Sequence, residues 1–291
     1  MPPLDTRIHA VRPDLADERL RGRAEAPRFV AGRAARIVAP AAPLRRAPAA
    51  DAPLDTEALM GEAATVFDER DGYAWVQLGQ DGYVGYVPGS VLGEPGPDPT
   101  HRVTALRTFC YPGPDLKRPP LAFLSLGAAV TATGAAEAGY LPVATGGYVS
   151  AVHLVEAGRR EPDFAATALL FAGTPYLWGG KTSLGLDCSG LVQLALAAAG
   201  VAAPRDSDMQ AAGLGAPVEL PPDLSGLRRG DLVFWRGHVG LMLDSATLLH
   251  ANGFHMAVAA EPLAEAERRI REGGGGPITG VRRLADPPER S

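Results

Sequence analysis

Cysteine and lysine are both scarce in this chain of 291 residues, which has only Cys110 and Cys188, and only Lys117 and Lys181. Two cysteines cannot form a disulfide framework, and so few are typical of a reducing compartment. A single Cys110–Cys188 bridge is the one pairing left open, and the same compartment argument disfavours it. The basic side chains are nearly all arginine, which we interpret as a bias of genomic composition.

The sequence also lacks an apolar run long enough to span a membrane. Charged residues interrupt every candidate stretch of a secretory signal near the N-terminus. We therefore expect a cytoplasmic protein with no membrane partner. A net charge of −5 disfavours nucleic acid as a partner. The cysteine and histidine spacings match no zinc pattern, so we expect no metal and no other cofactor.

The first 32 residues are charged and interrupted by proline, and we treat 1–32 as an N-terminal extension with one short helical candidate, Asp14 to Arg23. Short runs rich in β-branched and aromatic residues follow, separated by turn signals at Asp71-Gly72 and Asp81-Gly82. This pattern predicts a small all-β barrel over residues 33–93.

A second, looser copy of this pattern follows over residues 100–157, after the linker "GEPGPDP". In each copy a Gly-Tyr-Val turn, at Gly82 and at Gly147, precedes the third strand. A single irregular β domain of about 120 residues is the alternative interpretation.

From Glu161 the pattern becomes α+β, with helices first and an antiparallel sheet after them. Helices are predicted for "DFAATALLF", with Asp163 as N-cap, for a run ending at Gly200, and for Pro262–Arg271. The predicted strands are "DLVFW", "HVGLML", "TLLHAN" and "ITGVRRL".

Cys188 is the candidate nucleophile because it stands at a predicted helix start, where the helix dipole favours a thiolate. Asp187 is a suitable N-cap, and the glycine-rich loop before it predicts an approachable thiol. Cys110 lies in the β-type run "RTFCYPG", and we interpret it as a buried structural cysteine.

A thiol nucleophile needs a base, and two histidines on neighbouring strands are suitably spaced. A hairpin centred near Ser245 would place His250 opposite Gly240, with His238 one same-face step away. This register predicts His238 as the base and His250 as the group that orients it. His255 is the competitor for the orienting role.

Four segments, "TPYLWGGKTSLGLDCSGLVQLAL", "PRDSDMQ", "RRGDLVFWRGHVGLML" and "LLHANG", together resemble the NlpC/P60 family of papain-like cysteine peptidases. The resemblance covers Glu161 to about Leu284 and implies a catalytic domain over 161–286. The two β modules are similar to bacterial SH3 (SH3b) barrels. The fold class implied is α+β, a papain-like catalytic domain preceded by two small all-β SH3b barrels.

The resemblance implies an activity as well as a fold. The family hydrolyses γ-D-glutamyl bonds to a diamino acid in murein peptides, with Cys188, His238 and His250 in the catalytic positions. Two preceding SH3b modules resemble the subgroup that requires a free N-terminal L-Ala and uses the first module to wall off part of the cleft. In the cytoplasm the substrate would be recycled wall fragments.

A cationic substrate amine calls for a carboxylate, and Asp187 could be both N-cap and amine ligand. Tyr176 and the Cys188 N–H are candidate oxyanion donors. The other candidates for substrate binding are Ser189, Asp206, Ser207, Tyr83, Tyr86 and Glu57, the last three from the resemblance alone. The plainer readings are Asp187 as an N-cap only, Arg205 in a surface ion pair, and Tyr176 and Trp178 as loop packing.

Two other classes of function remain open from the sequence. The same Cys-His arrangement serves amide hydrolysis or acyl transfer on a substrate unrelated to murein. Alternatively, the protein binds wall peptides through its SH3b modules without cleaving them. The oligomeric state is not predicted.

Overall fold

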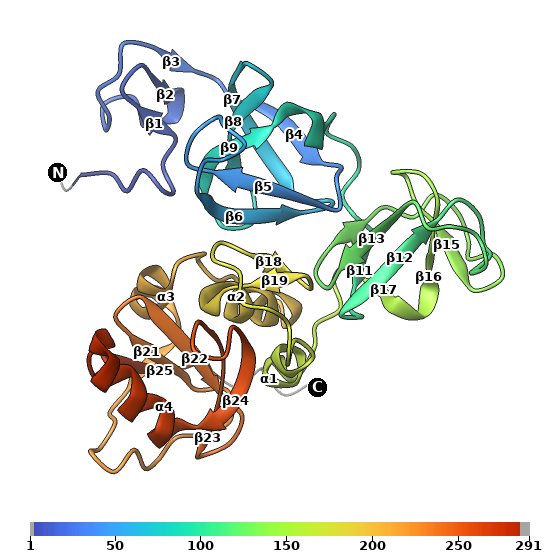
Figure 1. Cartoon of the computed structure of the whole chain (residues 1–291). Helices are drawn as coiled ribbons and strands as arrows, with labels where there is room; N and C mark the ends of the chain where they lie inside the picture. Colours follow the sequence, from blue (N-terminus) through green and yellow to red (C-terminus); the bar gives the residue numbers. More distant parts are fainter. Residues whose placement is uncertain (1–2, 286–291) are drawn as a thin grey trace. The chain divides into compact units, whose positions relative to one another are not determined.

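The computed structural model describes residues 3–285 (Figure 1). The chain divides into two compact units between Ala157 and Gly158, and each is described by itself. Residues 1, 2 and 286, at the ends of the expected N-terminal extension and catalytic domain, lie outside the described part. Within residues 3–285, no helix has the length and hydropathy that a membrane crossing requires.

The first unit is built almost entirely of strands. Its strands are β1 Val11–Arg12, β2 Leu15–Asp17, β3 Phe29–Val30, β4 Arg33–Ile37, β5 Ala41–Arg45, β6 Leu54–Leu59, β7 Ala63–Arg70, β8 Tyr73–Leu78, β9 Val84–Pro88, β10 Leu92–Gly93, β11 His101–Val103, β12 Arg107–Tyr111, β13 Ala122–Ser125, β14 Ala129–Val130, β15 Tyr140–Pro142, β16 Tyr148–Ser150 and β17 Leu154–Glu156. Three short 3-10 helices lie between them: η1 Glu18–Leu20, η2 Gly89–Val91 and η3 Ala151–His153.

A seven-stranded sheet in the order β10-β4-β7-β8-β9-β5-β6 forms the first β module. The turn predicted at Asp71-Gly72 joins β7 to β8, and both residues have positive φ, as a two-residue hairpin turn requires. Small and branched side chains fill the core, with Ile37, Leu44 and Val76 fully buried.

The expected helix at Asp14 to Arg23 is wrong, because this segment forms β2 and η1 instead. β2 pairs with β1 and, in parallel, with β3. Leu15 packs against Trp75 and Phe67 of the first β module. Burying Leu15 against these rings favours the extended backbone over a solvated helix.

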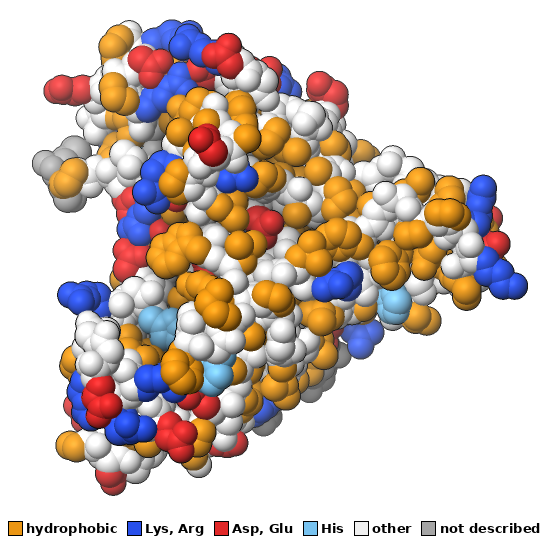
Figure 2. Space-filling view, viewed as in Figure 1, with side chains coloured by type: hydrophobic (Ala, Val, Ile, Leu, Met, Phe, Trp, Pro, Cys, Tyr) orange, Lys and Arg blue, Asp and Glu red, His pale blue; other side chains and the backbone are white. Residues whose placement is uncertain are grey.

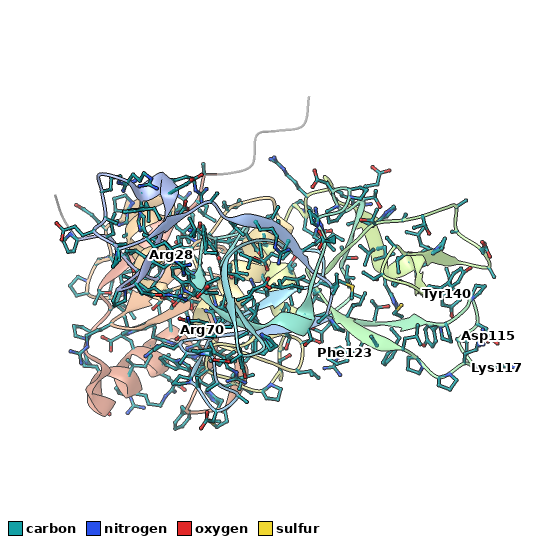
Figure 3. The ribbon with its side chains drawn as sticks, turned by 90° about the horizontal axis from the view of Figure 1, so that it is seen from above. Arg28, Arg70, Asp115, Lys117, Phe123 and Tyr140 are labelled. Atoms are coloured by element: carbon teal, nitrogen blue, oxygen red, sulfur yellow. The ribbon has the colours of Figure 1, made fainter. Side chains whose placement is uncertain are left out.

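The second β module contains a three-stranded sheet, β14-β11-β17, and a four-stranded sheet, β13-β12-β16-β15. Cys110 on β12 faces inward, and its Sγ donates to the Gly146 carbonyl at 3.3 Å. The opposite face of the four-stranded sheet carries aromatic rings, among them Phe123 and Tyr140, which are labelled in Figure 3.

The second unit combines short helices with a six-stranded antiparallel sheet in the order β20-β25-β21-β22-β23-β24. Strands β18 and β19 form a separate two-stranded sheet. Its helices are α1 Phe164–Leu169, α2 Cys188–Ala198, α3 Ser207–Gly213, α4 Leu263–Ile270 and the π-helical turn η4 Arg271–Gly275. Its strands are β18 Lys181–Thr182, β19 Gly185–Leu186, β20 Ala216–Val218, β21 Leu232–Trp235, β22 His238–Met242, β23 Thr247–Asn252, β24 Ala257–Pro262 and β25 Gly280–Arg283.

Helix α2 packs against β22 and β23, while α1 packs against α2. The predicted N-caps Asp163 and Asp187 each accept a hydrogen bond from the first turn of their helices. The four predicted strands all form. Strand β24 was not predicted, and it adds the edge next to β23.

Candidate active site

Cys188 is the first residue of α2, so its thiol lies at the positive end of the helix dipole. The residue is only 7% exposed, so the expectation of an openly approachable thiol is wrong. The backbone N–H of Val239, which directly follows His238, donates to the thiol sulfur. Helix α2 and strand β22 therefore meet at Cys188.

Burial, together with the neighbouring Asp187 carboxylate, raises the pKa of Cys188 to about 12. The Val239 N–H acts in the opposite direction because it stabilises the thiolate. The thiol is consequently protonated at neutral pH unless a base accepts its proton.

The predicted hairpin register between the two histidine strands is the one observed. Leu241 pairs with Leu249 and Met242 with Leu248. His238 Nε2 and His250 Nδ1 lie 2.8 Å apart, a hydrogen-bond distance. The structure thus brings together the two histidines that spacing alone selected.

The two histidines differ in exposure. His250 is fully buried, whereas His238 is partly exposed at the start of β22. Burial, together with His250 and Arg269, lowers the pKa of His238 to about 3. His238 is therefore a neutral imidazole at neutral pH, able to accept a proton. On the face drawn in Figure 2, histidine atoms reach the surface of the second unit beside hydrophobic side chains.

Glu261 on β24 is a residue that the sequence analysis missed. Its Oε1 lies 2.7 Å from His250 Nε2. Arg269 of α4 donates to both carboxylate oxygens, with the bond to Oε2 at 2.6 Å. These contacts extend the chain of interacting groups to His238–His250–Glu261–Arg269.

The signal that could have located Glu261 is the Asn252-Gly253 pair after "TLLHAN", because Asn-Gly is a strong hairpin marker. A hairpin there makes the following run a strand. In the structure His250 pairs with Ala259, and Glu261 lies two residues further along, on the same face.

His255 does not occupy the orienting position beside His238. Its backbone N–H and Nδ1 both contact Asn252 Oδ1, and its Nδ1 lies 3.8 Å from Glu261 Oε1. Side-chain atoms of His250, His255 and Glu261 that could ligate a metal lie within 4.8 Å of one another. Both ring nitrogens of His250 already have hydrogen-bond partners, so we assign this cluster to hydrogen bonding.

Asp187 and Arg205 form a buried ion pair beneath the first turn of α2. Arg205 is 1% exposed, so the reading of it as part of a surface ion pair is wrong. Its two terminal nitrogens lie 2.9 and 2.8 Å from the two Asp187 carboxylate oxygens. Asp187 also accepts from the backbone N–H groups of Gly190 and Gly179 at 2.8 and 2.9 Å. The Ser189 hydroxyl donates to Asp187 Oδ1 at 3.4 Å, so five donor groups hold this carboxylate.

Ser189 and Gln210 complete this polar cluster. The Ser189 hydroxyl accepts from Arg205 at 2.9 Å, and its carbonyl accepts from Gln210 Nε2 at 3.0 Å. Because Ser189 is 5% exposed, its side chain serves mainly to fix Arg205.

The other candidates from the second unit are more accessible. Tyr176 is half-buried, and burial, followed by the nearby Cys188 and Asp187 charges, raises the pKa of its hydroxyl. Asp206 and Ser207, at the start of α3, are also half-buried. Trp178 is 69% exposed, so it does not act as loop packing.

The three candidates from the first unit have different environments. Tyr83 is 5% exposed and belongs to the core of the first β module, so little of its ring is left for a ligand. Tyr86 is half-buried and lines a cavity of about 400 Å³ together with Trp75. Glu57 is half-buried on β6, where it pairs with Pro43.

Comparison with protein-family models gives two matches. Residues 44–92 match the SH3 domain of bacterial dipeptidyl-peptidases, and residues 173–268 match the NlpC/P60 family. The second match contains Cys188, His238, His250 and Glu261.

Two curated relatives are similar over most of the chain. Dipeptidyl-peptidase 6 of Lysinibacillus sphaericus is 32% identical over 191 residues, which cover 64% of this chain and 66% of the relative, just under two thirds of its length. The gamma-D-glutamyl-L-lysine dipeptidyl-peptidase of Bacillus subtilis (strain 168) is 29% identical, over 68% of this chain and 72% of the relative.

Among solved structures, an NlpC/P60 family protein from Bacillus cereus ATCC 10987 superposes with a TM-score of 0.72 and 21% sequence identity. The superposition covers 87% of this chain and all of that one. At this level of identity the match demonstrates a common fold.

Proposed function

The chain belongs to the NlpC/P60 family of cysteine peptidases and carries a bacterial SH3 domain, and from this premise we propose that it hydrolyses the γ-D-glutamyl bond to a diamino acid in murein peptides. The observation that carries the proposal is the placement of Cys188 at the start of α2, beside the N–H of Val239, which directly follows His238 of the hydrogen-bonded His238–His250 pair. The name of the Bacillus subtilis relative, gamma-D-glutamyl-L-lysine dipeptidyl-peptidase, supports the choice of bond.

The proposed reaction begins with proton transfer from the Cys188 thiol to His238. The thiolate then attacks the γ-carbonyl carbon of D-Glu, and the carbonyl oxygen becomes an oxyanion. The Cys188 N–H has no intrahelical acceptor at a helix start, and it can donate to this oxyanion, with the Tyr176 hydroxyl as a second donor.

Collapse of this intermediate breaks the C–N bond. His238 gives its proton to the leaving amine of the diamino acid, and a thioester remains on Cys188. His238 then takes a proton from water, the resulting hydroxide attacks the thioester carbon, and the C–S bond breaks to release Cys188 as thiolate. The thiolate takes this proton back from His238, which restores the thiol and the neutral imidazole. Each proton taken by His238 is thus returned within the cycle.

We propose further that the substrate is a peptide with a free N-terminal L-Ala. Asp187 is already held by five donor groups, and its charge is balanced by Arg205, which supports a mainly structural role. Asp206 and Ser207 are less buried, so we expect them to contribute more to amine binding. Tyr86 is the aromatic candidate from the first β module.

Two further proposals concern organisation. We propose that residues 100–157 form a second SH3b module after the first at 33–93, and that the catalytic domain begins near 161. The second β module has its own three-stranded and four-stranded sheets, which supports this division. A cytoplasmic location, with recycled wall fragments as substrate, stays a prediction.

The test is mass spectrometry of L-Ala-γ-D-Glu-meso-diaminopimelate incubated with wild type, Cys188→Ala and Cys110→Ala, beside the N-acetylated peptide. We expect diaminopimelate release from the free-amine peptide with wild type and Cys110→Ala, and none with Cys188→Ala. Cleavage of both peptides would show that the enzyme does not require a free N-terminal amine. Cleavage of neither would favour another amide substrate or a purely wall-binding role.

A further inference from the structure

We propose that Glu261 and Arg269 are positioning residues that fix the tautomer of His250 and thereby make Nδ1 the basic nitrogen of His238. The inference rests on the proposed peptidase function for its catalytic consequence, but its structural content concerns the free protein.

Arg269 determines the state of Glu261. Two guanidinium nitrogens of Arg269 donate to the two carboxylate oxygens, a bidentate arrangement that favours the charged acid. Hydrogen bonds from Arg269 and His250 outweigh burial and lower the pKa of Glu261 to about 2. Glu261 is consequently a carboxylate, which can only accept hydrogen bonds.

Glu261 then determines the state of His250. The 2.7 Å contact between Glu261 Oε1 and His250 Nε2 requires the nitrogen to donate. Burial holds the pKa of the fully buried His250 below its usual value, so the ring is neutral and carries one proton. That proton is on Nε2, and Nδ1 is left as an acceptor.

His250 in turn determines the state of His238. Because His250 Nδ1 accepts, the 2.8 Å contact requires His238 Nε2 to be the donor. A neutral His238 with its proton on Nε2 has its lone pair on Nδ1. The nitrogen that takes the proton of Cys188 is therefore Nδ1, and the His250 contact also sets the orientation of the ring.

Other charged groups face this chain of contacts. His255 lies 3.8 Å from Glu261 Oε1, and Glu265 on α4 reinforces the charge of Arg269. The Glu261 charge raises the pKa of His238, whereas Arg269 lowers it. Removing the Glu261 charge should therefore make the His238 imidazolium lose its proton at lower pH.

The first experiment is long-range ¹H–¹⁵N NMR of ¹⁵N-histidine-labelled full-length protein at pH 7, with His238→Gln and His250→Gln used to assign the signals. We expect both histidines to carry their proton on Nε2. A His250 protonated on Nδ1 would overturn the proposal. This readout does not depend on any substrate, so it remains decisive if the proposed peptidase activity fails.

The second experiment measures kcat, KM and the pH profile of Glu261→Gln, Glu261→Ala and Arg269→Ala, with Arg268→Ala as control. Arg268 lies on the same helix but pairs with the exposed Glu272. For Glu261→Ala we expect about a 100-fold lower kcat with little change in KM, and a mixture of His250 tautomers. Glu261→Gln keeps an acceptor oxygen and should lose about tenfold in kcat by the same comparison.

The pH profile separates positioning from general damage to the fold. With Glu261→Gln the acidic limb of kcat/KM should move to lower pH, because the base His238 must be unprotonated in the free enzyme and its imidazolium loses a stabilising anion. Arg268→Ala should keep the wild-type profile. Wild-type kcat and an unshifted acidic limb in both Glu261 variants would contradict the proposal.

Discussion

The two cysteines of this protein are equally hidden, and they nevertheless lie in very different surroundings. Cys110 is 6% exposed in the second β module, and Cys188 is 7% exposed at the start of α2. Burial raises the pKa of both thiols. Neither exposure nor the direction of the pKa change therefore distinguishes the candidate nucleophile from the structural cysteine.

The neighbours make the distinction. Cys110 lies within strand β12, where its sulfur donates to the Gly146 carbonyl, and the Tyr148 N–H opposes the effect of burial on its pKa as the Val239 N–H does for Cys188. Around Cys188 lie a helix N-terminus, the Val239 N–H and the strand that carries His238. The comparison teaches that a buried thiol becomes reactive through the groups that accept its proton and hold its charge.

Removal of the two thiols should give the largest difference. Cys188→Ala should lower hydrolysis of the murein peptide by at least about 10³-fold, because a catalytic unit without its nucleophile loses nearly all its activity. Cys110→Ala should retain wild-type activity, measured as diaminopimelate release. Equal losses of activity in the two variants would show that the surroundings of the two cysteines do not distinguish a nucleophile from a structural residue.

The buried ion pair under Cys188 should give the next largest effect. Arg205→Met leaves the Asp187 charge buried without its partner and should lower the free energy of unfolding by about 3–5 kcal/mol. Arg229→Met is the matched control, since Arg229 pairs with Asp163 at 42% and 44% side-chain exposure and should cost about 0–1 kcal/mol. Urea unfolding at pH 7 measures both, and similar losses would show that burial of the pair is unimportant.

Alkylation should separate the thiols directly in the wild-type protein. We expect iodoacetamide at pH 7 to modify Cys188 at least about tenfold faster than Cys110, because Cys188 lies at a helix N-terminus and His238 is its proposed base. His238→Ala should remove most of this difference. Peptide mass spectrometry follows both sites in one sample, and equal slow labelling would support the wall-binding alternative.

The smallest effect should come from crowding Cys110. A Cβ at Gly147 would lie 2.7 Å from Cys110 Sγ and 2.6 Å from the Tyr111 carbonyl oxygen, whereas a Cβ at Gly146 would meet nothing within 4 Å. Both glycines have φ near +90°, so an alanine would cause similar backbone strain at either position. Gly147→Ala should therefore destabilise by about 1–3 kcal/mol more than Gly146→Ala, with activity unchanged. Thermal unfolding and the peptide assay test the two parts.

The parts of the site that the sequence predicted depend on short-range patterns. An N-cap followed by a helix located Cys188, and the length of one hairpin placed His238 near His250. Glu261 was missed because "AVAAEP" is rich in alanine, which favours a helix, and only pairing with β23 makes it a strand. The burial of Arg205 was missed because its partner Asp187 lies 18 positions earlier in the chain.

The fold shows the same limit. Turn signals located the strands of the first β module. The core of this module is formed by segments that lie close together in the sequence, so local patterns were sufficient. The helix expected at Asp14 to Arg23 failed because Leu15 is buried against Trp75, a contact between distant parts of the sequence. Local propensity gives way where tertiary burial is larger.

The turn between β22 and β23 limits which insertions this chain can accept, because the number of inserted residues decides which face of the sheet His250 lies on. The turn is closed by Asp244, whose Oδ1 accepts from the backbone N–H groups of Ala246 and Thr247 at 2.8 Å each. Because side chains alternate along a strand, inserting one residue into this turn would send His250 to the opposite face, away from His238, while two residues would restore it. Insertions of odd length here should yield folded but inactive proteins, and those of even length should be the ones that natural variation can use.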